Sequence, residues 1–396
     1  MRVLVVTLPP FDGGVPFKTR QLCTVLRGWG HDVTVASYPT FHHFPQKNWS
    51  LLSPRIGSGP GVEQAICFDD FPALFIGCWL PELEATYTHP SLRWTDVINS
   101  FDRHIAVGGT PIVAHPLAAS GLPFLLWCAS DVEGDRRDRQ RAMSLPRRWL
   151  DKGLVSPWLH RIESYILSSP LGRVRTVSET ARRNILERGC PSGHLATMPI
   201  PVELDRLSPP DNPPRPGIVG FAGRYNDPRK NILLAFRMLK SARDKGIDLQ
   251  LHLAGAEPSP FLANLVSSEG LSDRVVFKGE LSREELMAFY AGLDIFLIPS
   301  AQEGLCISGI EAMACGVPVV TTPCGGPLDY VLDGRTGFVA DSSEALLAHC
   351  QALATDRELR DRLSAAAHDW VRSRYSLSSF QSNLAEAWRD TWGDEP

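Results

Sequence analysis

From residue 218 to residue 321, short apolar runs alternate strictly with stretches of helical character, and this pattern restricts the fold more than any other feature. The apolar runs predict strands at residues 218–222, 249–254, 275–278, 295–298 and 317–321. The segments between them predict helices at residues 231–242, 261–267, 283–291 and 308–314. Strict strand–helix alternation indicates a doubly wound α/β domain with a parallel sheet.

The first half begins with the same pattern. Residues 3–8 and 32–37 predict buried strands, and the helix predicted between them, residues 17–29, makes the three a βαβ unit. Further strands are expected at residues 73–78, 105–107, 123–128 and 173–177, and Ser178 is expected to cap a helix that ends at Glu187. The first half is therefore a second Rossmann-like domain.

The boundary between the domains is predicted from a proline-rich linker. Residues 204–216 hold five prolines, which exclude both helix interiors and strand ladders. We therefore expect an N-terminal domain over residues 1–204 and a C-terminal domain over residues 205–375. Residues 344–392 predict consecutive helices, the last of which begins near residue 376.

Bulk composition excludes several classes of protein. A net charge of -4 gives no support for nucleic-acid binding, which usually needs a basic face. The nine cysteines are scattered without a C-x-x-C pair, which indicates reduced thiols and a cytoplasmic protein. The apolar run at residues 3–8 is too short for a secretory signal, and no apolar run is long enough to cross a bilayer.

The densest group of candidate site residues follows the strand at residues 295–298. Glu303 lies in the loop, and Glu311 lies eight positions later in the helix, so they can reach different parts of one extended ligand. Gly304 allows backbone amides to approach a ligand, and the helix start near Ser308 offers free N–H groups and a positive dipole end. This arrangement suits a sugar phosphate. The alternative is a solvated loop acid and a helix-face acid.

This segment resembles the E-x7-E motif of family-4 retaining glycosyltransferases of the GT-B fold, and so does the segment from Phe221 to Asn231. The similarity continues through residues 325–330 and 333–338. It implies two Rossmann-like domains that face a central cleft, an acceptor site in the N-terminal domain and a donor site in the C-terminal domain. It also implies that the last helix, residues 376–396, packs back on the N-terminal domain.

The resemblance assigns roles to the C-terminal residues. Glu303 would contact hydroxyls of the donor sugar, and Glu311 would contact the ribose. The backbone near Gly304 and Leu305 would meet the sugar or phosphate, with Gly223, Cys306 and Ile307 also in the donor site. Arg224 and Lys230 would stabilise the leaving diphosphate, since cations there favour the transition state. The sequence has no Asp-x-Asp pair, so a metal-independent reaction with no cofactor beyond the donor is expected.

In the N-terminal half, Gly13 and Gly14 would let backbone approach the phosphates, although a glycine pair after a strand also fits an ordinary tight turn. His115 and Asp131 are the candidates for acid–base catalysis, with a structural histidine and a helix cap as the alternatives. If neither acts, the donor phosphate itself would be the base, which is one proposal for this family.

The acceptor is expected to carry a hydroxyl group and to be a small molecule, a saccharide or a lipid-linked compound. Three segments expected to be loops would select it: residues 38–61, 81–95 and 133–158. The stretch at residues 136–161 is rich in Arg and Trp. It fits a peripheral contact with the inner face of a membrane, or a solvated helix pair with Trp149 and Trp158 in the core. Asp135, Asp138 and Asp151 reduce its positive charge.

The sequence thus predicts a glycosyltransferase that uses a nucleotide-diphosphate sugar. Two alternatives remain: a nucleotide-sugar epimerase of the same fold, and a non-catalytic protein that binds nucleotide sugars.

Overall fold

The computed structural model describes residues 1–9, 14–38, 60–68, 70–80, 86–210 and 215–396, with the side chains of residues 137–139 and 141–142 left out. The chain divides into two compact units. The first comprises Met1–Ile200 and Gln381–Pro396, and the second comprises Pro201–Phe380. The division falls four residues before the one predicted from the prolines, and the chain returns to the first unit near its end.

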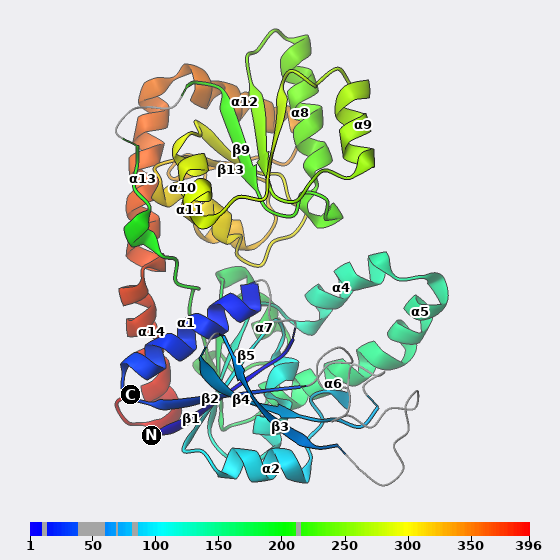
Figure 1. Ribbon diagram of the computed structural model, residues 1–396, viewed down its shortest axis with the longest axis vertical. Coiled ribbons are helices and arrows are strands. Elements are labelled where there is room, and N and C mark those ends of the chain that lie inside the picture. Colours follow the sequence, from blue (N-terminus) through cyan, green and yellow to red (C-terminus); the bar gives the residue numbers. More distant parts are fainter. Residues whose placement is uncertain (10–13, 39–59, 69, 81–85, 211–214) are drawn as a thin grey trace. The chain divides into compact units, whose positions relative to one another are not determined.

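The first unit is built on an eight-stranded sheet with the order β3-β4-β2-β1-β5-β6-β7-β8 (Figure 1). Its strands are β1 (Arg2–Thr7), β2 (Asp32–Ser37), β3 (Val62–Cys67), β4 (Phe71–Ile76), β5 (Arg103–Gly108), β6 (Phe124–Cys128), β7 (Gly172–Thr176) and β8 (Leu195–Thr197). All neighbours pair in parallel except β3 and β4, which are antiparallel. The strands β3 and β8 were not expected from the sequence.

The helices of the first unit correct the loops predicted from the sequence. They are α1 (Gly14–Gly28), α2 (Leu92–Asn99), η3 (Pro111–Ala114), α3 (His115–Ala119), α4 (Val132–Ala142), α5 (Leu145–Leu150), η4 (Asp151–Val155), α6 (Ser156–Leu167), α7 (Glu179–Glu187) and η5 (Ser192–His194). The segment predicted as a loop at residues 133–158 is therefore helical, and α2 begins within the loop predicted at residues 81–95. Residues 39–59 of the third predicted loop, and residues 81–85, lie outside the described residues.

The second unit is a six-stranded parallel sheet with the order β11-β10-β9-β12-β13-β14 (Figure 1). Its strands are β9 (Ile218–Ala222), β10 (Gln250–Ala254), β11 (Val275–Gly279), β12 (Ile295–Ile298), β13 (Val319–Thr321) and β14 (Gly337–Val339). Its helices are η6 (Leu204–Arg206), η7 (Pro228–Lys230), α8 (Ile232–Asp244), α9 (Pro260–Ser268), α10 (Arg283–Ala291), α11 (Ile307–Ala314), η8 (Gly326–Asp329), α12 (Ser343–Thr355) and α13 (Arg357–Tyr375). The final helix, α14 (Leu377–Trp392), starts in this unit and ends in the first.

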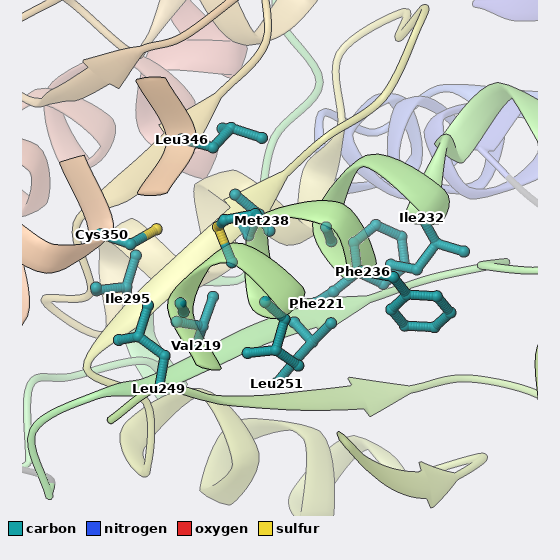
Figure 2. Packing of buried hydrophobic residues seen from close by; sticks show 14 of the residues in the cluster. Val219, Phe221, Ile232, Phe236, Met238, Leu249, Leu251, Ile295, Leu346 and Cys350 are labelled. Carbon is teal, nitrogen blue, oxygen red and sulfur yellow. The ribbon is translucent and has the colours of Figure 1, made fainter. Parts of the chain in front are cut away.

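Side chains of the central strands and of two covering helices form the core of the second unit. Figure 2 shows Val219 and Phe221 of β9, Leu251 of β10, and Phe236 and Met238 of α8 in this cluster. All six strands of this sheet are parallel, so the loops after the strands lie along one edge. In parallel α/β sheets, ligands bind at this carboxyl edge.

No helix among the described residues is both long and apolar enough to cross a membrane.

Candidate functional site

A lysine and a glutamate that lie 73 residues apart meet at the carboxyl edge of the second sheet. The Lys230 ammonium donates to both carboxylate oxygens of Glu303, at 2.7 and 2.9 Å. The hydroxyl of Ser300 donates to the same carboxylate at 2.5 Å. Only 18% of the Lys230 side chain and 8% of the Glu303 side chain are exposed. The ion pair is therefore mostly buried, but part of it remains accessible to solvent.

Two further contacts tie the loop after β9 to the loop after β12. The Ala301 amide donates to the Arg229 carbonyl at 2.8 Å, and the Asn231 side chain donates to the Pro299 carbonyl at 3.1 Å. Asn231 has φ 47°, a left-handed conformation that asparagine tolerates better than most residues. These contacts fix the position of Lys230 against Glu303.

The second acid of the motif is Glu311, which lies in α11. Glu311 is 6% exposed. Its carboxylate accepts from Arg283 at 2.5 Å and from the Tyr290 hydroxyl at 2.8 Å. Arg283 and Tyr290 are seven residues apart on α10, so they share one helix face. Burial, followed by the negative charge of Glu311, raises the pKa of Tyr290 well above its usual value, so its hydroxyl remains a donor.

The start of α11 is held by a tyrosine side chain from another loop. Cys306 precedes the helix with φ 61°, and its carbonyl accepts from the Tyr330 hydroxyl at 2.9 Å. The Gly304 position faces open space, since a Cβ placed there would meet no atom within 4 Å. The first N–H groups of a helix lack intrahelical partners, so this helix start can accept a ligand's negative charge.

A cavity of about 550 Å³ connects these parts. Its lining includes the predicted residues Gly223, Arg224, Lys230, Cys306, Ile307 and Glu311. Glu303, Gly304 and Leu305 are not among the lining residues, although Glu303 contacts the lining residue Lys230. Leu305 is buried, at 4% exposure.

Sequence reasoning missed part of this lining. Gly255, Glu280, Leu281 and Tyr290 also face the cavity. Gly255 and Glu280 directly follow β10 and β11, so the rule that ligands bind beyond strand ends could have identified them. The seven-residue spacing of Arg283 and Tyr290 was a further available signal.

The candidate acid–base residues of the first unit lie in different surroundings. Burial, followed by the nearby His89, lowers the pKa of His115 to about 4, so its imidazole is neutral at pH 7. The ring lies edge-on to His89 and to Tyr165, with centroids 6.2 and 6.1 Å away. Its Nδ1 is buried and has no hydrogen-bond partner among the residues that the structure describes.

Asp131 is held by α7. It is 3% exposed, and its carboxylate accepts from Asn184 and from Arg188, both at 3.3 Å. It stands at the start of α4, as expected for a helix-capping residue, although its side chain makes no capping hydrogen bond there. The Asp131 carboxylate is therefore held by side-chain contacts within the first unit.

The glycine pair after β1 is only partly described. Gly14 is the exposed first residue of α1, where a Cβ would meet no atom within 4 Å, and Gly13 lies outside the described residues. All nine cysteines are described, and all are unpaired thiols. Burial raises the pKa values of Cys306 and Cys315 to about 12, so both thiols are protonated at neutral pH.

Comparisons with known proteins agree with this geometry. Residues 208–370 match the family described as glycosyl transferases group 1. The chain is similar to two proteins of Mycolicibacterium smegmatis. One is a GDP-mannose-dependent alpha-(1-6)-phosphatidylinositol monomannoside mannosyltransferase, which is 31% identical over 54% of this chain and 61% of that protein. The other is a GDP-mannose-dependent alpha-mannosyltransferase, which is 26% identical over 98% and 94%.

Among solved structures, sucrose-phosphate synthase from Thermosynechococcus elongatus superposes with a TM-score of 0.70 at 19% identity, covering 99% of this chain and 100% of that one. Together with the two parallel α/β units, this likeness shows the GT-B fold. The matches as a whole support enzyme activity as a glycosyltransferase. The chain spans less than two thirds of the first relative, so its donor and acceptor are treated as proposals.

Proposed function

We propose that this protein is a family-4 glycosyltransferase that moves a sugar from a nucleotide-diphosphate sugar to a hydroxyl group, with retention of anomeric configuration and without a metal ion or other cofactor. One observation carries the proposal. Arg224 and Lys230 line the same 550 Å³ cavity as Glu311, and Lys230 holds Glu303 beside it. Two cations and two acids are what a charged diphosphate between two hydroxyl-rich sugars requires.

The chemistry follows from where charge develops. The bond between the sugar C1 and the phosphate oxygen breaks, and negative charge grows on the departing diphosphate. Arg224, Lys230 and the positive end of α11 stabilise that charge more in the transition state than in the ground state. A bond then forms between C1 and the acceptor oxygen, and the acceptor proton passes to a phosphate oxygen. This route is supported by the low pKa of His115 and by the pairing of Asp131 with Arg188.

The two acids, Glu303 and Glu311, would contact different parts of the donor. Glu303 would accept hydrogen bonds from the transferred sugar, and Glu311 from the ribose. Arg283 and Tyr290 hold the Glu311 carboxylate in a fixed orientation before the donor arrives. This orientation lowers the cost of ordering the site on binding.

The relatives suggest the first donor and acceptor to try. Both proteins of M. smegmatis are named as dependent on GDP-mannose, and one acts on a phosphatidylinositol mannoside. We propose GDP-mannose as the leading donor and a lipid-linked saccharide as one acceptor class.

We also propose a cytoplasmic protein with peripheral contact to an anionic membrane, made by an amphipathic face on α5, η4 and the start of α6. Its exposed apolar side chains are Leu145, Trp149, Leu150, Leu154 and Trp158. Its basic side chains are Arg147, Arg148, Lys152 and Arg161, and Asp151 is the one acid in residues 143–161. Asp151 is buried and accepts from Arg136 at 2.9 Å, so it does not offset the exposed positive charge as the sequence suggested.

Incubation with GDP-mannose and with uridine, adenosine and thymidine diphosphate sugars tests the proposed reaction. We expect one nucleoside diphosphate to raise the melting temperature, and its sugar nucleotide to be cleaved slowly without an acceptor. The product's anomeric configuration, read by NMR, should match that of the donor, and EDTA should not change the rate. Interconversion of the donor sugar would show an epimerase instead. Nucleotide binding without turnover would show a non-catalytic protein, and the absence of any binding would refute the assignment.

A further inference from the structure

A second cavity, of about 670 Å³, lies in the first unit between the end of β4 and the start of α2. Three tryptophans contribute to its walls: Trp79, Trp94 and Trp158. Trp94 is buried, whereas Trp79 and Trp158 are 54% and 37% exposed. The cavity therefore presents large aromatic surfaces to solvent. This is unusual for a surface that binds nothing.

The polar groups of this cavity favour an apolar occupant. The Thr86 hydroxyl donates to the Leu80 carbonyl at 2.8 Å, and the Ser91 hydroxyl caps α2 by accepting from the Trp94 amide at 3.4 Å. Both hydroxyl groups therefore already form hydrogen bonds within the chain. His89, Arg93 and Asp96 are the remaining polar side chains of the lining, among residues with described positions. A saccharide of this size would need more convergent hydrogen-bonding groups.

Trp158 links the cavity to the amphipathic face. It lines the cavity and is also the last apolar side chain of that face. Leu150, Leu154 and Trp158 follow one another at intervals of four residues, so they lie along one side of the continuous helical segment. Trp158 therefore belongs both to the exposed face and to the cavity wall.

The charge of the amphipathic face indicates which kind of molecule would bind to this face and to the cavity. Arg147, Lys152 and Arg161 are the exposed basic side chains of the face. They attract an anionic surface, and the apolar side chains between them suit the acyl region beneath a lipid headgroup. A lipid has both properties in one molecule.

We propose that this cavity binds the hydrocarbon chain of an anionic membrane lipid, and that the acceptor is therefore anchored by such a chain. The inference rests on the proposed glycosyl transfer, because it identifies the acceptor class for that reaction. The lipid would lie with its headgroup among the basic side chains of the amphipathic face and its chain against Trp158 and Trp79.

Calorimetric titration of the full chain with dodecyl phosphate, below its micelle concentration, tests the cavity. We expect dodecyl phosphate to bind at least tenfold more tightly than octyl phosphate, since each added methylene is removed from water. Trp79→Ala should weaken the binding of dodecyl phosphate by tenfold or more, and so should Leu92→Asn, which changes an 83% exposed side chain in the lining.

Trp149→Ala is the matched control. Trp149 is 78% exposed and belongs to the amphipathic face, but it does not line the cavity. This variant should bind dodecyl phosphate within twofold of the wild type, yet bind phosphatidylglycerol vesicles several-fold more weakly. Equal affinity for the two chain lengths would overturn the proposal, as would unchanged affinity in both cavity variants.

A thermal-shift measurement with nucleoside diphosphates on the same preparations separates the two proposals. A retained nucleotide shift with no chain-dependent binding removes only the lipid-chain site. Loss of every nucleotide shift in the wild type removes the glycosyl-transfer assignment.

Discussion

At the scale of single residues, the contact between Lys230 and Glu303 is the most informative feature of the second unit. We predict that Lys230→Ala and Glu303→Gln each lower kcat/KM for the sugar nucleotide by at least about tenfold, or about 1.4 kcal/mol. Each change removes one charge of a pair with short contacts on both carboxylate oxygens. The double variant should lose less than the sum of the two, since the residues act together.

A second lysine–glutamate pair of the same unit provides matched controls. Lys240 and Glu269 form an ion pair with about half and a third of their side chains exposed, and neither residue lines the cavity. Lys240→Ala and Glu269→Gln should leave kcat/KM within about twofold, because exposed ion pairs contribute little. Wild-type activity in Lys230→Ala and Glu303→Gln would remove these residues from the site.

Lys18 is a fully buried charge in the first unit. Its ammonium donates to the carbonyls of Gly108 at 2.9 Å and Trp127 at 3.2 Å, and it lies 5.0 Å from the centre of the Trp127 ring. Burial lowers the pKa of Lys18 from 10.5 to about 7, with the neighbouring Cys128 acting in the opposite sense. Lys18 therefore connects α1 to the ends of β5 and β6, at the cost of burying an ionisable group.

This pKa shift predicts how stability depends on pH. Between pH 7 and 10.5 the unfolded chain keeps the Lys18 proton while the folded chain loses it, so the free energy of unfolding should rise with pH. Relative to Lys18→Met, we expect the wild type to gain up to about 1.4 kcal/mol per pH unit between pH 7.5 and 8.5. Below about pH 6 the difference between the two proteins should become independent of pH.

Denaturant unfolding of both proteins across this range measures the difference, in which groups common to both cancel. The Cys128 thiol, whose pKa burial raises to about 12, stays protonated in the folded state throughout. A flat difference between pH 7.5 and 8.5 would show that Lys18 does not titrate there.

At the scale of elements, two loops of the second unit contact each other closely at Gly326. A Cβ at Gly326 would overlap the carbonyl oxygen of Gly304. The Gly326 amide also donates to the Glu303 carbonyl at 3.1 Å. Because the overlap is with backbone, we predict that Gly326→Ala displaces the 303–305 segment and weakens nucleoside-diphosphate binding at least tenfold, as read by titration calorimetry.

Gly292→Ala is the comparison variant for this loop. Its Cβ would meet its nearest atoms at 3.5 Å, an ordinary contact, so binding should stay unchanged. Wild-type affinity in Gly326→Ala would mean that the loop contact does not position the donor site.

Sequence alone predicted the regular elements well where apolar periodicity was strong. The strand β12 and the helix α10 occupy their predicted residues, and Ser178 caps α7 by accepting from the Ala181 amide. The strands β3, β8 and β14 were missed: β8 and β14 have only three residues each, and β3 carries Glu63 and Gln64 among its apolar residues. The helices α4 and α5 were expected only in the helix-pair alternative for residues 136–161, because charged residues and Pro146 obscure their apolar positions.

The site was predictable in kind but not in its contacts. The motif spacing identified Glu303 and Glu311 as candidates, yet nothing in it indicates that Lys230 bonds Glu303 or that Arg283 bonds Glu311. Such pairs span 73 and 28 residues, and only the fold brings them together. The alternative in which Trp149 and Trp158 lie in the core was wrong. Both side chains are exposed, in a helical segment whose apolar side faces solvent.

At the scale of the whole molecule, the chain passes between its two units twice. It leaves the first unit at residue 200 and returns to it at residue 381, within α14. The returning segment is anchored by Trp388, which is fully buried and stacks on His31 with ring centroids 4.9 Å apart. Arg175 and Arg103 form ion pairs with Asp390 and Asp394. The first unit therefore includes the end of the chain.

This anchoring predicts that the last helix stabilises the first unit specifically. Trp388→Ala should lower the free energy of unfolding of that unit by about 3–5 kcal/mol, the usual cost of truncating a buried tryptophan. Trp149→Ala, at an exposed position of the same unit, should cost less than about 0.5 kcal/mol. Scanning calorimetry with a bound nucleoside diphosphate identifies the transition of the second unit, since a ligand raises only the unit that binds it. A drop in that transition instead would place the contribution of Trp388 in the second unit and contradict the division of the chain.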